Sequence, residues 1–99
     1  MISNINIDEL LNKKGKINII DIRNIEKYNN NHINDAINIP IEKLLIEPEK
    51  YLDKETRYYL YCQKGMSSYN ACNILSKLGF KVTNINGGYE SYIIHKRNQ

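Results

Sequence analysis

Cys62 is the residue of this sequence best placed to carry out chemistry. It follows the aromatic and apolar run RYYLY at residues 57–61 and opens the segment CQKGMS, in which Gly65 permits backbone angles that other residues resist. A tight loop of this kind can turn successive N–H groups inward, and a helix beginning near Ser67 or Ser68 adds the positive end of its dipole. Both effects favour the thiolate, which is the nucleophilic form of cysteine.

The polar neighbours of Cys62 are consistent with this interpretation. Lys64 can add positive charge at the rim of the loop, and Ser67 or Ser68 can cap the helix or hydrogen-bond to sulfur or to substrate oxygens. The alternative is that Cys62 is a small buried hydrophobic residue, which is a common fate of free cysteine. Spacing alone leaves both interpretations open.

A helix is predicted directly after this loop. Apolar residues beyond Ser68 recur at the i, i+3, i+4, i+7 spacing of one helix face, and Gly79 is a typical C-terminal stop. These apolar residues are Ala71, Ile74, Leu75 and Leu78.

Strands and helices alternate along the rest of the chain. Runs rich in β-branched or aromatic residues predict strands at 17–22, 36–39, 57–61 and 81–85. Helical segments are predicted at 7–14, 24–31, 41–53 (one or two turns around Pro48) and 89–96, with Gly87-Gly88 as a turn. This order favours an α/β fold with a parallel sheet, right-handed crossovers and helices on both faces. In such sheets ligands bind at the carboxyl ends of strands, which is where Cys62 lies.

Length and composition restrict the classes of protein that fit. A chain of 99 residues predicts one domain, residues 1–99, with enough length to close one core. The net charge of +3 comes from 14 basic and 11 acidic residues, without a block of like charges, so we expect no nucleic-acid or membrane partner. The small positive excess fits an anionic substrate, and it fits an ordinary solvated surface equally well.

Targeting and redox signals are also informative. The first residues do not read as a signal peptide, and no apolar run approaches the length of a membrane span. Cys62 and Cys72 are too few for a disulfide scaffold, so a reducing cytoplasm is the expected compartment.

Four ordered motifs resemble the rhodanese-like domain, which is the sulfurtransferase family. The first is the strand ending in Asp21-Ile22-Arg23, and the second is the segment HINDAINIP at 32–40. The third is the active-site strand and loop at 61–68, and the fourth combines Gly79-Phe80 with the closing segment NGGY at 86–89. The resemblance extends over nearly the whole chain, and it implies a small three-layer fold with about five parallel strands.

The resemblance implies a persulfide mechanism. The Cys62 thiolate takes the outer sulfur of thiosulfate or a similar anionic donor, and then passes it to cyanide, a thiol or a protein acceptor. No metal or organic cofactor is implied. The active-site loop that binds the substrate consists of Gln63, Lys64, Gly65, Met66, Ser67 and Ser68.

One departure from the family concerns the end of this loop. Many relatives have Arg where this chain has Ser67, whereas some single-domain thiosulfate sulfurtransferases end in Gly-x-Ser-Ser, which resembles Gly65-Met66-Ser67-Ser68. Persulfide chemistry on Cys62 is therefore expected, and the choice of sulfur donor stays open.

Other polar residues near the site have two interpretations each. Arg23 could attract an anionic donor, but a structural ion pair with Asp21 is favoured. His32 could be a general base, but a hydrogen bond that fixes its loop is favoured. Cys72 could resolve the persulfide into a disulfide, but it lies one position beside the apolar stripe, which favours a packed thiol.

Two rival functions remain. Cysteine phosphatases need an Arg six positions after the cysteine to grip phosphate, and that position is Ser68 here. A non-catalytic rhodanese-like module, or a sulfur carrier for a protein partner, is the other alternative, and the intact Cys62 argues against the non-catalytic form.

Overall fold

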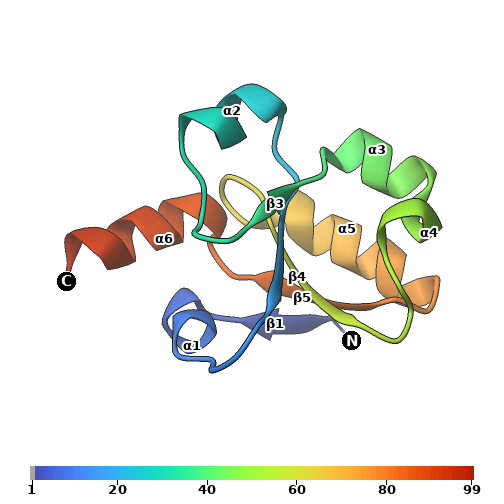
Figure 1. The fold of residues 1–99 in the computed structure, drawn as a ribbon, viewed down its shortest axis with the longest axis horizontal. Coiled ribbons are helices and arrows are strands. Elements are labelled where there is room, and N and C mark those ends of the chain that lie inside the picture. Colours follow the sequence, from blue (N-terminus) through green and yellow to red (C-terminus); the bar gives the residue numbers. More distant parts are fainter. Residues whose placement is uncertain (1) are drawn as a thin grey trace.

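Five parallel strands form the centre of the molecule in the computed structural model, which describes residues 2–99. The strands are β1 (Ser3–Ile5), β2 (Asn18–Asp21), β3 (Ile37–Asn38), β4 (Arg57–Tyr61) and β5 (Lys81–Ile85). They lie in the order β1-β5-β4-β2-β3, and each neighbouring pair is parallel (Figure 1). The predicted parallel α/β fold is confirmed.

Helices cover both faces of this sheet. They are α1 (Ile7–Leu11), α2 (Ile25–Asn30), α3 (Ile41–Ile46), α4 (Pro48–Tyr51), α5 (Met66–Lys77) and α6 (Gly88–Arg97). The α3, α4 and α5 helices pack on one face, while α1, α2 and α6 lie on the other (Figure 1). Within residues 2–99, none of the helices combines the length and apolarity that crossing a membrane requires.

Alternate residues of each central strand supply two separate cores. Ile20 and Leu60 belong to the core beneath α3, α4 and α5, whereas Ile19 and Tyr61 belong to the core beneath α1 and α6. Because both faces are covered, the strands carry nearly continuous apolar runs rather than an alternating pattern.

The edge strand β1 was not located by the sequence patterns. It has only three residues, of which Ile5 alone is buried, and it pairs with β5 in the register Ser3 to Thr83. A segment this short and polar lacks a hydrophobic period, so its strand geometry depends on the hydrogen bonds offered by β5.

The predicted buried face of α5 was wrong, because the residues that are buried lie on a face rotated about the helix axis from the predicted one. Ile74 and Leu78 are 45% and 50% exposed, whereas Ser68 and Cys72 are completely buried. Cys72 therefore lies within the buried stripe and not beside it. The buried residues are Ser68, Ala71, Cys72 and Leu75, which also follow the i, i+3, i+4, i+7 spacing.

Candidate active site

Cys62 lies directly after β4, under the loop that leads into α5. Its Sγ accepts the N–H of Gly65 at 3.1 Å and the N–H of Ser68 at 3.3 Å. Gly65 has a φ of 102°, in the left-handed region that favours glycine, and this angle turns the chain back over the sulfur. The expected convergence of N–H groups on Cys62 is therefore present.

Further N–H donors belong to the same loop. The N–H groups of Met66 and Ser67 belong to the first turn of α5, where helical geometry supplies no intrahelical acceptor. They are available to the oxygens or the outer sulfur of a bound anion, and the dipole of this 12-residue helix favours the same charge.

A shallow hollow of about 360 Å³ opens onto the cysteine. Cys62 is only 7% exposed, so its sulfur lies at the floor and neighbouring side chains form the rim. The lining residues are Lys27, Cys62, Gln63, Lys64, Met66 and Ser67.

Ser68 connects Cys62 to the sheet. Its hydroxyl lies 3.3 Å from Sγ and donates to Oδ1 of Asn84 at 2.6 Å. The Nδ2 of Asn84 in turn donates to Oδ1 of Asn4 on β1 at 3.2 Å. Asn84 was not predicted from the sequence, where the signal was a polar residue inside the strand KVTNI, and it is buried in the structure.

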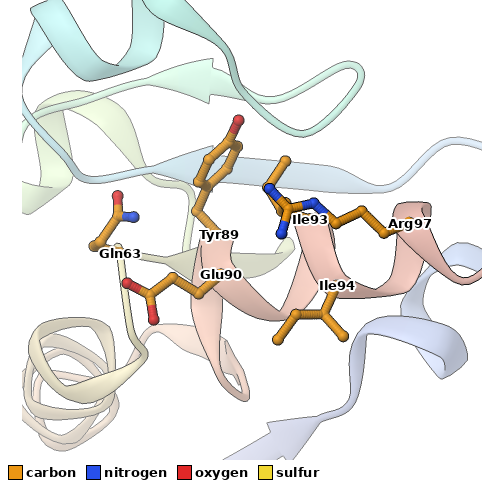
Figure 2. Close-up of a pocket in the computed structure, with 6 residues that line it drawn as sticks. All are labelled: Gln63, Tyr89, Glu90, Ile93, Ile94 and Arg97. Atoms are coloured by element: carbon orange, nitrogen blue, oxygen red, sulfur yellow. The ribbon is translucent and has the colours of Figure 1, made fainter.

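The start of α6 holds the backbone of the loop. The N–H of Tyr89 donates to the carbonyl of Cys62 at 2.9 Å, and the N–H of Glu90 donates to that of Gln63 at 3.1 Å. A Cβ on Gly88 would collide with the Cys62 carbonyl oxygen, so only glycine allows this approach. Figure 2 shows Gln63 facing the first turn of α6. The predicted glycine turn is thus part of the site.

Asp21 and Arg23 form a buried ion pair at the end of β2. Nη2 of Arg23 lies 2.7 Å from Oδ2 of Asp21, and Nε contacts both carboxylate oxygens. Burial by itself lowers the pKa of Arg23, but the hydrogen bond and charge of Asp21 outweigh it and raise that pKa. The Tyr61 hydroxyl donates to the same carboxylate at 2.6 Å.

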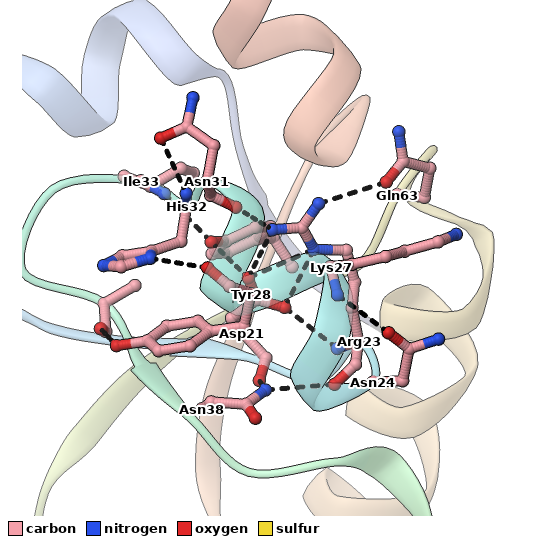
Figure 3. A network of polar contacts seen from close by, with 12 residues as sticks. Asp21, Arg23, Asn24, Lys27, Tyr28, Asn31, His32, Ile33, Asn38 and Gln63 are labelled. Atoms are coloured by element: carbon pink, nitrogen blue, oxygen red, sulfur yellow. Dashed lines mark hydrogen bonds and ion pairs between the residues drawn. The ribbon is translucent and has the colours of Figure 1, made fainter.

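Arg23 also ties neighbouring loops together (Figure 3). Its Nη1 donates to Oε1 of Gln63 at 3.1 Å, and Nη2 donates to the carbonyl of Asn31 at 2.7 Å. The guanidinium lies over the Tyr89 ring, 4.2 Å from its centroid. Arg23 thus forms the ion pair with Asp21 that the sequence favoured.

His32 makes the hydrogen bond expected of a residue that fixes its loop, and Cys72 is buried as expected of a packed thiol. His32 Nδ1 lies 2.9 Å from the carbonyl oxygen of Tyr28, and the two rings stack at 3.9 Å, which fixes the loop after α2. Cys72 is buried in the core, and burial raises the pKa of its thiol to about 12. It is a packed thiol.

The fold and this site together define a class of protein. A parallel sheet covered on both faces, with a cysteine under a loop of N–H donors at the carboxyl end of a central strand, is the architecture of a cysteine-based α/β enzyme. Residues 6–95 match the family model of the Rhodanese-like domain, so the chain belongs to this family, as a rhodanese-type enzyme. Within residues 2–99, no group of three or more His, Cys, Asp or Glu side chains is arranged to hold a metal ion.

Individual relatives agree with this assignment. The chain is 37% identical over 84 residues to the thiosulfate sulfurtransferase GlpE of Coxiella burnetii, covering 84% of this chain and 78% of the relative. It is 34% identical over 89 residues to the putative sulfurtransferase YtwF of Bacillus subtilis, covering 88% and 84%. The crystal structure of a rhodanese-related protein from Thermoplasma volcanium superposes with a TM-score of 0.85 at 30% identity, covering 94% and 92%.

Proposed function

We propose that this protein is a thiosulfate sulfurtransferase that carries sulfur on Cys62 as a persulfide. The observation that supports it most directly is the pair of N–H groups, from Gly65 and Ser68, that point at the Cys62 sulfur. Such donors favour the thiolate and would stabilise negative charge on a bound sulfur. The family and its relatives support sulfur transfer in general, and thiosulfate as the donor is part of this proposal.

The reaction is a double displacement. The Cys62 thiolate attacks the outer sulfur of thiosulfate, a new S–S bond forms, and the donor's S–S bond breaks with its electron pair leaving on sulfite. An acceptor such as cyanide or a thiol then attacks the outer sulfur of the persulfide. The electron pair of that S–S bond returns to Cys62, which regenerates the thiolate. Neither step requires a metal or an organic cofactor.

The loop from Gln63 to Ser68 supplies the binding groups in this scheme. The N–H groups of its last residues, in the first turn of α5, would bind the donor, and the Ser68 hydroxyl would contact the cysteine sulfur. Asp21 and Arg23 act indirectly in this scheme. Arg23 positions Gln63 by a hydrogen bond, and its charge is already paired with the carboxylate of Asp21. A cytoplasmic site of action, expected from the few cysteines, is part of the same proposal.

A phosphatase is disfavoured by the position of Ser68. Its side chain is fully buried and its hydroxyl is engaged by Asn84, so no guanidinium stands where phosphate would need one. A sulfur carrier or a non-catalytic interaction module remains the second candidate, because the shallow hollow would leave a persulfide accessible to a protein acceptor.

The decisive measurement is thiocyanate formation from thiosulfate and cyanide. The wild-type protein is expected to turn over, and Cys62→Ser is expected to lose activity by at least about a thousandfold because no other group carries the sulfur. Cys72→Ala is the matched cysteine control and should retain turnover.

Other outcomes separate the alternatives. Activity that survives Cys62→Ser would overturn the assignment of the nucleophile. A persulfide on Cys62 without transfer to cyanide would favour a sulfur carrier. No persulfide with any donor would favour an interaction module, and phosphate release from an aryl phosphate would indicate a phosphatase.

A further inference from the structure

The Ser68 hydroxyl is a further hydrogen-bonding group at the Cys62 sulfur. Its Oγ lies 2.6 Å from Oδ1 of Asn84, 3.3 Å from Sγ of Cys62 and 3.3 Å from the carbonyl oxygen of Gly65. An amide oxygen carries no hydrogen, so the serine hydrogen lies in the short contact with Asn84. The hydroxyl therefore turns lone pairs toward Cys62, which suits a neutral S–H group and not a thiolate.

Asn84 holds this hydroxyl from within the sheet. It is 3% exposed, and it lies on β5 between the strands β1 and β4. Its Nδ2 donates to Oδ1 of Asn4, an exposed residue on β1, at 3.2 Å. A buried amide needs a partner at each end, and Asn84 has Ser68 at one end and Asn4 at the other.

The amide of Asn84 fits the same neighbours in two orientations. Its oxygen and nitrogen are similar in size, so a half-turn of the amide places Nδ2 against Oγ of Ser68 and Oδ1 against Asn4. In that second orientation Asn84 donates to the serine oxygen, and the serine hydrogen is released to Cys62. Asn4 must then turn its own Nδ2 toward Asn84. It can do so because it is exposed and this Nδ2 donates only to the carbonyl of Ile2, at 3.2 Å.

The contacts from Asn4 through Asn84 and Ser68 to Cys62, called the relay below, contain no charged partner besides the sulfur itself. Titratable side chains on the elements around Cys62 are Asp21, Arg23, Lys27, Lys64, Cys72 and Glu90. Within residues 2–99, none of these six forms a hydrogen bond with Ser68 or Asn84. The direction of the serine hydroxyl is therefore set by the amide of Asn84.

We propose that Asn84 is a positioning residue that turns the Ser68 hydroxyl toward Cys62 when negative charge is on the sulfur, and away from it when the sulfur is neutral. The inference rests on the proposed function and deepens it. As the persulfide forms, charge leaves Sγ and the hydroxyl returns to Asn84. When the acceptor attacks, the electron pair of the S–S bond returns to Sγ, and the hydroxyl joins the N–H groups as a further donor there. Asn84 therefore favours release of sulfur to the acceptor.

The test measures the rate at which iodoacetamide modifies Cys62 as a function of pH, a reaction that needs the thiolate and no sulfur donor. Asn84→Asp keeps the shape of the side chain, but an ionised carboxylate only accepts hydrogen bonds and so holds the serine hydrogen in every state. We expect it to lower the rate at pH 7 about tenfold and to move the midpoint of the pH profile upward by about one pH unit. Asn84→Leu leaves the hydroxyl to the sulfur and should not raise the midpoint.

The exposed end of the relay supplies a variant that leaves the core intact. Asn4→Asp cannot donate to Asn84, so it holds the amide in the orientation seen in the structure and should also raise the midpoint. Asn6→Asp is the matched control, because Asn6 is exposed and its Oδ1 accepts from Nδ2 of Asn86 at 2.9 Å. That second amide pair does not bind Ser68, so the same added charge should leave the profile unchanged.

Ser68→Ala decides whether the hydroxyl carries the effect. In this background Asn84→Asp and Asn4→Asp should lose most of their influence on the midpoint. Shifts of equal size with and without the hydroxyl would overturn the relay, because added charge or a loosened loop would then be the cause. A midpoint that stays constant in both aspartate variants would overturn it too.

A single-turnover measurement connects the relay to sulfur transfer. With Cys62 loaded as the persulfide, Asn84→Asp should slow transfer to cyanide about tenfold, because the hydroxyl no longer reaches the departing sulfur. The alkylation profile does not depend on turnover, so a protein that forms no persulfide contradicts the proposed function while the relay is still measured. An active sulfurtransferase whose alkylation profile is the same in every variant contradicts the relay alone.

Discussion

The two cysteines show how strongly position determines the chemistry of one residue type. Cys62 lies at the floor of an open hollow with N–H groups directed at its sulfur, while Cys72 on α5 is buried among the apolar side chains of the core. Burial raises the pKa of Cys72 to about 12, which keeps it as the unreactive thiol at neutral pH.

We therefore predict selective alkylation of the native protein. Iodoacetamide at pH 8 should modify Cys62 alone, since Cys72 is both buried and protonated there. Peptide mass spectrometry identifies the modified residue. Cys62→Ser should stay unmodified until urea exposes Cys72, and labelling of both cysteines at equal rates in the native protein would contradict this picture.

At the scale of elements, the site depends on a contact between two helix starts. The α5 helix begins beside the cysteine, and α6 begins beneath it, where its first N–H groups hold the carbonyls of Cys62 and Gln63. Gly65 and Gly88 both have positive φ angles, and a Cβ on either would meet backbone of the other segment. The loop is thus shaped by long-range contact as well as by its own sequence.

Gly88→Ala is predicted to damage both stability and activity. The added Cβ would displace the Cys62 carbonyl, so we expect a loss of about 3–5 kcal/mol in the free energy of unfolding and a large drop in turnover. Gly15→Ala is the matched control, because Gly15 also has a positive φ but faces open space, and it should cost only about 1 kcal/mol. Urea unfolding measures both, and equal losses in the two variants would show that backbone strain alone is responsible.

At the scale of the whole molecule, one buried polar network joins the sheet to the loops around the site. Tyr61 on β4 donates to Asp21 on β2 and accepts from the N–H of Ile33 at 3.0 Å, while Arg23 extends the network to Gln63. Burial and the hydrogen bond to Asp21 raise the pKa of Tyr61 above its ordinary value. The fold therefore requires the neutral phenol.

The raised pKa values of Tyr61 and Cys72 predict a loss of stability in alkali. A group whose pKa is raised on folding contributes stability that is complete below its unfolded pKa and is lost as the pH rises. For Cys72 the loss begins near pH 9 and for Tyr61 near pH 10, with a slope approaching about 1.4 kcal/mol per pH unit for each group. Urea unfolding between pH 7 and 11 should follow this decline.

Tyr61→Phe tests the assignment. It should lower stability at pH 7 by about 1–3 kcal/mol through the lost hydrogen bonds, yet flatten the decline above pH 10. Tyr69→Phe, at an exposed position on α5, is the control and should keep the full decline. An unchanged alkaline slope in Tyr61→Phe would show that other groups control it.

Sequence alone determined the features that local patterns encode. The alternation of strands and helices predicted the parallel α/β sheet, and the order of strand, glycine loop and helix located Cys62 at a strand end. These features depend on side-chain periodicity and on the special backbone of glycine, both of which act within a few residues.

Tertiary structure alone decided which distant residues meet at the cysteine. Placing β5 between β1 and β4 brings Asn84 to Ser68, and packing α2 above the strand ends brings Lys27 to the hollow over Cys62. The same packing determines which face of α5 is buried, so that Ser68 faces the sulfur while Ile74 is half exposed. No local pattern contains these contacts, because they depend on the order of strands in the sheet and on which helices cover each face.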